Sequence, residues 1–206
     1  STSLKVFIKA TTWSWRALAG ASARALNLAK IASAMMTAVI ALFGWQIQEV
    51  PMPGSVYRMI LCGPGPIGGI VEDKSISIPQ WMPYLAVDDA DATATKITEH
   101  GGVLCVPPTD IPNAGRFAVV NDPNGGHFSI FQGLPESQGF DPEQLVPGRA
   151  CWNETYTTDL DKAQAFYSAV FGWQVEKKDM GDAGMYHVQT IGGRQAGGMM
   201  KHPMPG

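Results

Sequence analysis

The sequence predicts an α+β fold that is built from repeated β-α-β-β-β modules. The tetrapeptide Phe-Gly-Trp-Gln occurs at residues 43–46 and again at 171–174, and a methionine, a tyrosine and a Gly-Gly pair follow both copies in the same order. The second copy contains a helical stripe of apolar residues between strand-like stretches. The 23 glycines and 15 prolines favour many turns, as a strand-rich fold requires.

The module at residues 149–206 shows this order most clearly. A strand at 152–158 precedes Asp159, whose side chain can cap a helix. Apolar residues at helical spacing continue to Phe171, and Gly172 is suited to end the helix. Three further strands are predicted at 174–176, 185–191 and 196–200.

A second module is predicted at residues 75–134. It consists of a strand at 81–87, a helix from Asp89 to His100, and strands at 103–106, 117–121 and 127–132. Residues 122–126, Asp-Pro-Asn-Gly-Gly, form a strong turn signal between the last two strands. The proline-containing stretch 135–148 is interpreted as a linker to the module at 149–206.

Residues 1–74 are predicted to form an atypical first module. When the copies are aligned on Phe43, an alanine-rich stretch that favours helix falls where the first strand should lie. Either residues 4–10 supply that strand and a longer helix follows, or the module has lost or replaced its first strand.

Composition excludes several kinds of partner. The net charge is -3 and no long basic run occurs, so no nucleic-acid partner is expected. The longest uncharged run, residues 31–45, is shorter than the roughly 20 residues of a membrane helix, so no membrane partner is expected either. Cys62, Cys105 and Cys151 are odd in number and widely spaced, which favours reduced thiols and a cytoplasmic location.

Two groups of motifs resemble the vicinal-oxygen-chelate superfamily, which contains glyoxalases, bleomycin resistance proteins and dioxygenases. Residues 152–159, with Ala-Phe-Tyr at 165–167 and Phe-Gly-Trp at 171–173, are similar to the odd-numbered modules of two-domain glyoxalase-like proteins. Residues 81–91 and 115–125 resemble the even-numbered modules. The resemblance implies modules that pair into a cup-shaped sheet, with helices on the convex side and a ligand or metal in the concavity.

The resemblance also places the metal ligands of the family on the first and last strands of paired modules. Here these positions hold Met82, Trp152 and Ser129. Methionine prefers soft metals, serine is a weak ligand, and tryptophan offers no lone pair. We therefore expect no metal and no cofactor, with an irregular metal site that uses Glu72 and His127 as the alternative.

Alternation of side chains along strands predicts two ligand-binding faces. One face contains Trp152, Glu154 and Tyr156, and the other contains Tyr84, His127 and Phe131.

For Glu154 and Arg116 the sequence leaves two roles open. Glu154 is a candidate general base if it is partly buried, and a solvated or structurally paired carboxylate otherwise. Arg116 can hold an anionic ligand through its planar fork, or it can form a surface ion pair. The repeat-related Tyr57 and Tyr186 are expected to be structural.

These observations leave three functions open, and whether the chain is an enzyme stays open with them. The first is a metal-independent binder of a small organic molecule, such as a protein that sequesters a drug or metabolite. The second is a divalent-metal-dependent lyase, isomerase, transferase or dioxygenase, and the third is a non-catalytic assembly module with filled cups. The missing ligands favour the first. A homodimer is expected because the module at 149–206 has no following module to cover its sheet.

Overall fold

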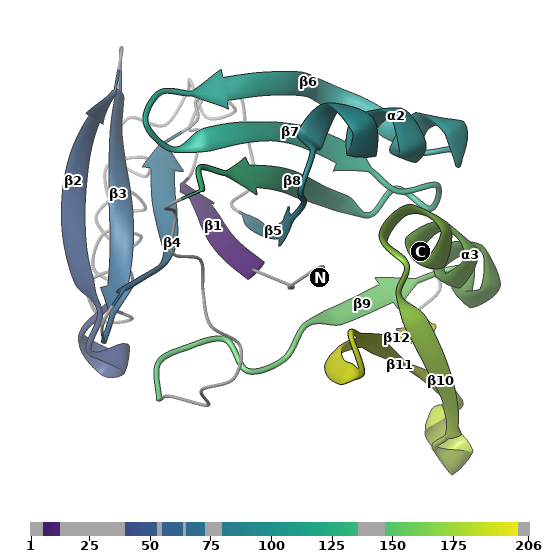
Figure 1. Ribbon diagram of the computed structural model, residues 1–206. Coiled ribbons are helices and arrows are strands. Elements are labelled where there is room, and N and C mark those ends of the chain that lie inside the picture. The colour runs from purple at the N-terminus through teal and green to yellow at the C-terminus, as the bar shows by residue number, and fades with distance from the viewer. Residues whose placement is uncertain are drawn as a thin grey trace, which may run out of the picture. The chain divides into compact units, whose positions relative to one another are not determined.

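The computed structural model describes residues 6–12, 40–52, 55–63, 65–72, 80–135 and 147–201. These residues group into two compact units, one with most of the first module and the start of β5, and one with most of the second and third modules (Figure 1). Strands predominate and each sheet is open, which confirms the predicted α+β class. Most of the predicted linker, residues 136–146, lies outside the described residues. No described helix is long and apolar enough to cross a membrane.

The first module has the strand order β2-β3-β4-β1. Its strands are β1 (Val6–Thr12), β2 (Gln46–Met52), β3 (Ser55–Cys62) and β4 (Gly65–Glu72). β1 pairs in parallel with β4, and the other neighbours are antiparallel. β1 overlaps the 4–10 alternative, so the module has a first strand. Residues 40–43 are helical and Gly44 follows with a φ of 65°, whereas residues 13–39 lie outside the described part of the chain.

The second module has the strand order β5-β8-β7-β6, and β5 is parallel to β8. Its elements are β5 (Gln80–Ala86), α2 (Ala90–Glu99), β6 (Val103–Ile111), β7 (Gly115–Asn121) and β8 (His127–Gly133). The Asp89 side chain accepts a hydrogen bond from the backbone N–H of Ala92, which confirms the predicted cap. β6 runs past its predicted end at residue 106, because register shifts accommodate Pro107 and Pro108.

The third module repeats this topology as β10-β11-β12-β9, again with the first and last strands parallel. Its elements are β9 (Glu154–Thr157), α3 (Leu160–Phe171), β10 (Gln174–Asp179), the short helix η2 (Gly181–Ala183), β11 (Met185–Ile191) and β12 (Arg194–Lys201). Asp159 caps α3 by accepting from the backbone N–H of Lys162. Gly172 ends the helix in the left-handed region, with a φ of 70°. Both predicted helix ends are confirmed.

The sequence repeat has a packing cause in the first and third modules. Tyr57 lies over Gly69 on the neighbouring strand, and Tyr186 lies over Gly198 in the same way. A Cβ built on either glycine would overlap the tyrosine ring and hydroxyl. A tyrosine in this position therefore requires one glycine of the Gly-Gly pair beneath it, which explains why the two features are repeated together.

One hydrophobic core joins the second and third modules. It contains buried residues of α2, of α3 and of the strands beneath them, including Ile97, Ile130, Phe166 and Met199. The rings of Tyr167 and Trp173 stack at its centre, with centroids 5.0 Å apart. α2 and α3 therefore each pack on one face of the sheet of their own module, and that face contributes to the shared core.

A polar contact fixes the same junction. The Tyr167 hydroxyl donates to the buried carboxylate of Asp122 at 2.9 Å, and the backbone N–H groups of Asn124 and Gly126 donate to the other carboxylate oxygen. Burial, followed by the contact with Asp122, raises the pKa of Tyr167 well above its usual value. The turn at 122–126 therefore also anchors the second module to α3.

Candidate ligand-binding site

The predicted face of β9 is turned away from α3. Met199 of β12 is fully buried in the core that α3 covers, and it pairs with Thr155. Because successive side chains on a strand point to opposite faces, Glu154 and Tyr156 lie on the other side of the sheet. Gly198 is the register partner of Glu154 on β12.

Three side chains on this face are joined by hydrogen bonds. The Tyr186 hydroxyl donates to Oε1 of Glu154 at 2.5 Å. The Trp152 indole N–H lies 2.8 Å from the Tyr186 hydroxyl, to which it donates, and 3.2 Å from the same carboxylate oxygen. The structure therefore brings the predicted Trp152 and Glu154 together, and it adds Tyr186 from β11.

Tyr186 reaches β9 because β12 has no side chain in its path. The ring crosses β12 at Gly198, whose missing Cβ leaves room for the hydroxyl next to Glu154. Partial burial, followed by the hydrogen bond to Glu154, raises the pKa of Tyr186, so its hydroxyl stays protonated at neutral pH. The sequence predicted a structural role for Tyr186. The repeated pairing of a tyrosine with a Gly-Gly motif was the available signal that its ring lies across a strand.

The group of Trp152, Glu154, Tyr156 and Tyr186, here called the aromatic–carboxylate cluster, is open to solvent. Trp152 is 39% exposed and Tyr156 is 52% exposed. Tyr156 lies close enough to Tyr186 to contribute to the raised pKa of the Tyr186 hydroxyl. Large exposed aromatic side chains around one carboxylate are typical of a surface that binds a small molecule or a partner.

The second predicted face, with Tyr84, His127 and Phe131, does not form one exposed surface. Tyr84 and Phe131 lie together with ring centroids 6.3 Å apart, but Tyr84 is only 7% exposed and the neighbouring Ser129 is fully buried. Burial raises the pKa of Tyr84, and its hydrogen bond to Ser129 acts in the opposite direction. His127 is exposed and its Nδ1 lies 2.6 Å from Oδ1 of Asn121. Their role in ligand binding stays a prediction.

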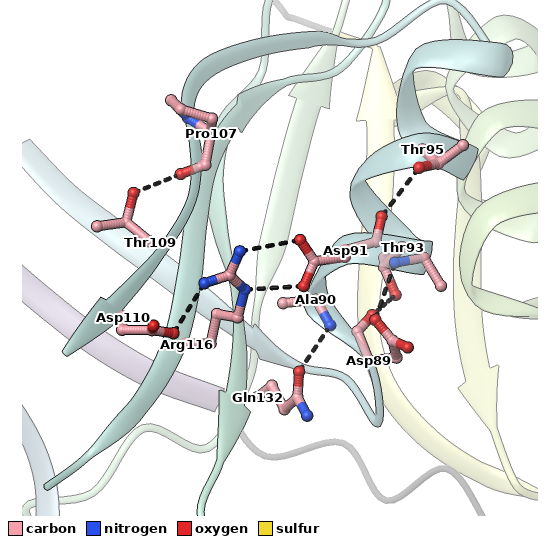
Figure 2. Close-up of polar contacts among 11 residues, drawn as sticks. Asp89, Ala90, Asp91, Thr93, Thr95, Pro107, Thr109, Asp110, Arg116 and Gln132 are labelled. Carbon is pink, nitrogen blue, oxygen red and sulfur yellow. Dashed lines mark hydrogen bonds and ion pairs between the residues drawn. The ribbon is translucent and has the colours of Figure 1, made fainter. Parts of the chain in front are cut away.

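Arg116 takes the surface ion-pair arrangement (Figure 2). Its guanidinium donates to both carboxylate oxygens of Asp91 at 2.8 and 2.9 Å and to Asp110 at 2.8 Å. The hydrogen bonds from Arg116 lower the pKa of Asp91. Gln132 accepts a hydrogen bond from the backbone N–H of Ala90 beside it. Arg116 thus ties the first turn of α2 to β7 and β6, and a role with an anionic ligand stays a prediction.

The described residues do not fit the metal site that the fold family implies. Of the three aligned positions, Met82 and Ser129 are buried, and the Trp152 indole N–H is a donor to its neighbours. Within the described ranges, no group of three or more histidine, cysteine, aspartate or glutamate side chains is placed to hold an ion. The alternative donor Glu72 has no described side chain. We therefore derive no chemical step through a metal.

Comparisons with known proteins point to one group of relatives. The family model for the N-terminal region of bleomycin resistance-like proteins matches residues 149–188. CFP32 of Mycobacterium tuberculosis, named as a candidate glyoxylase, is 33% identical over 172 residues, which are 80% of this chain and 65% of CFP32. The anthracycline biosynthesis protein DauV of Streptomyces is 30% identical over 148 residues, covering 64% of this chain and 53% of DauV. The chain thus spans less than two thirds of these relatives.

Solved structures share the fold at low sequence identity. A Mn(II)-bound glyoxalase from Novosphingobium aromaticivorans matches 98% of this chain and 62% of its own, with a TM-score of 0.60 and 12% identity. A variant of homoprotocatechuate 2,3-dioxygenase from B. fuscum matches 98% of this chain and 54% of its own, with a TM-score of 0.63 and 10% identity. At these identities the likeness concerns the arrangement of elements alone.

Proposed function

Because the chain belongs to the vicinal-oxygen-chelate superfamily, we propose that it is a metal-independent small-molecule-binding protein of the glyoxalase and bleomycin-resistance type, which sequesters a drug or metabolite. The observation that carries this proposal is the aromatic–carboxylate cluster of the third module. Trp152 and Tyr156 of this cluster are exposed, and hydrogen bonds join Trp152 and Tyr186 to Glu154.

The chemistry of the cluster suits binding without bond breaking. Tryptophan and tyrosine offer large rigid surfaces at a small loss of side-chain entropy, and a few polar groups then orient the ligand. The Tyr186 hydroxyl and the Trp152 indole N–H are both directed at Glu154, so they preorganise the carboxylate before a ligand arrives.

The names of the relatives are compatible with an aromatic or amphipathic ligand. DauV is named for anthracycline biosynthesis, and anthracyclines are aromatic compounds. The divalent-metal-dependent enzyme is the weaker proposal, because the aligned positions hold a methionine, a serine and a tryptophan.

We also propose a cytoplasmic location. Cys62, Cys105 and Cys151 are all free, and free thiols are typical of proteins in a reducing compartment.

A thermal-shift screen of aromatic and amphipathic molecules tests the proposed function. A molecule that binds the native state raises the melting temperature, by an amount that grows with its concentration above the dissociation constant. We expect stabilising molecules whose effect persists in the presence of EDTA and is lost in a Trp152→Ala variant. Stabilisation only by divalent metal ions, with no effect from any organic molecule, would refute the proposal.

A further inference from the structure

The Glu154 carboxylate has no cationic partner in the described part of the chain. The other acidic side chains of this module include Glu176, which lies 3.8 Å from Lys178, and Asp161, which lies 3.2 Å from Lys177. Within residues 80–135 and 147–201, no ion pair involves Glu154. Its charge is instead surrounded by neutral aromatic side chains that donate hydrogen bonds.

The hydrogen bonds leave part of the carboxylate available. Trp152 and Tyr186 both donate to Oε1, and no described hydrogen bond reaches Oε2. A carboxylate can accept about four hydrogen bonds over its two oxygens. Oε2 of Glu154 therefore stays open to a positively charged group that comes from outside the chain.

The first module shows that the tyrosine does not need this carboxylate. Tyr57 lies over Gly69 as Tyr186 lies over Gly198. By backbone register, Gly69 pairs with Lys9 on β1, whereas Gly198 pairs with Glu154 on β9. The two modules thus share the tyrosine–glycine packing but differ at the adjacent position, so a carboxylate there is a feature of the third module and not a requirement of the fold.

We propose that the aromatic–carboxylate cluster binds an organic cation, with an ammonium group beside Glu154 and an apolar body against the aromatic rings. This inference rests on the proposed function and names the class of its ligand. Ammonium groups are attracted to the faces of tryptophan and tyrosine, and rings that surround one carboxylate combine this attraction with a charge pair. The ligand supplies the counter-charge that the described residues do not.

A matched pair of probes tests the charge requirement. The cation is (para-hydroxyphenyl)trimethylammonium, and its neutral counterpart is para-tert-butylphenol, which has the same shape. Titration of the full chain is followed by the NMR shift of the Trp152 indole N–H, assigned with a Trp152→Phe variant. We expect the cation to bind at least about tenfold more tightly than the neutral phenol, because its quaternary ammonium adds attraction to the aromatic faces and a charge pair with Glu154, without needing an N–H.

Two glutamine variants provide the internal comparison. Glu154→Gln keeps the side-chain shape and removes the charge, so the affinity for the cation should fall about tenfold while that for the phenol stays within twofold. Glu176→Gln is the matched control. It lies on the same face three strand spacings away, roughly 14 Å, and it already has Lys178 as a neighbour. Its affinity for the cation should stay within about twofold.

The outcomes separate this inference from the proposed function. If both probes bind equally well and Glu154→Gln changes neither, the site binds small molecules but is not selective for cations, and the inference is wrong. If neither probe shifts the Trp152 signal and the thermal-shift screen also finds no organic ligand, the proposed function fails as well. If the screen finds only neutral or anionic ligands, the proposed function stands and the inference fails.

Discussion

Gly198 decides where Tyr186 can lie, and through it how the carboxylate of Glu154 is held. The ring crosses β12 at the glycine and donates to the carboxylate on β9. The hydrogen bond between Tyr186 and Glu154 therefore depends on Gly198, which has no side chain to make a polar contact. The repeat of tyrosine and Gly-Gly was visible in the sequence, but the close approach of ring and backbone was not, because it depends on strand register.

Gly198→Ala is expected to displace Tyr186 and to destabilise the third module. A new Cβ would overlap the ring, and overpacking of this kind costs about 1–3 kcal/mol in the free energy of unfolding. Urea unfolding measures this loss, and the Trp152 indole N–H signal should shift at the same time. Gly65→Ala is the matched control, because Gly65 lies in β4 and, apart from its chain neighbours, no atom of the described residues lies within 4 Å of an added Cβ. Equal stability of both variants would contradict the packing account.

The buried His187 is expected to make the free energy of unfolding depend on pH. It is 2% exposed, and its Nδ1 has no hydrogen-bond partner among the described residues. Burial, followed by the positive charge of Lys177, lowers its pKa below the ordinary 6.5, and Asp161 opposes this. The unfolded chain then binds the proton more readily than the folded chain, so stability is lost as the pH falls below about 6.5.

Urea unfolding at about pH 7.5 and about pH 5.5 checks this dependence. The wild type should lose more stability between these values than His187→Gln, which has no proton to gain. Each unit by which the folded pKa lies below the unfolded pKa corresponds to about 1.4 kcal/mol. An identical loss in wild type and variant would show that other groups cause the pH dependence.

Helices and strands were predictable where local signals decide them. Asp89 and Asp159 cap their helices as expected, and Gly172 ends α3. β6 was predicted too short, at residues 103–106, because the sheet accommodates Pro107 and Pro108 through register shifts. Pairing with β7 extends this strand, and pairing is a tertiary effect that local sequence does not report.

The hydrogen bond from Tyr167 to Asp122 is expected to stabilise the junction between the second and third modules. Tyr167→Phe keeps the ring stacked on Trp173 but removes the hydroxyl that donates to buried Asp122. The carboxylate then lacks one donor, which is expected to lower the free energy of unfolding by about 1–3 kcal/mol. Tyr156→Phe, at an exposed tyrosine, should change it by less than about 0.5 kcal/mol. Comparable effects of both substitutions in urea unfolding would count against this anchor.

Across the whole molecule, the repeat predicted that the first and third modules are related, but the exposure of each candidate face had to come from the structure. The two candidate faces had similar residues in the sequence. Tyr84 is nearly buried whereas Tyr156 is more than half exposed, and this difference depends on what packs against each sheet. For Arg116 the sequence favoured a surface ion pair over an anionic ligand, and the structure supplies Asp91 and Asp110 as the partners.

The predicted homodimer would pair two whole chains. β9 lies at one edge of the four-stranded sheet of the third module and carries the exposed Tyr156, with the exposed Trp152 just before it. Such edges favour pairing with another chain. Light scattering at micromolar concentration should give about twice the 22.1 kDa of one chain. A mass of one chain at all concentrations would show that the prediction is wrong.

The central claim is that the chain binds a small organic molecule without a metal. Its most direct test is a titration with (para-hydroxyphenyl)trimethylammonium before and after exhaustive treatment with EDTA, followed by the Trp152 indole N–H signal. The same dissociation constant is expected in both titrations, because the contacts come from Glu154 and the aromatic rings. Loss of binding after EDTA, with recovery on addition of a divalent metal ion, would contradict it.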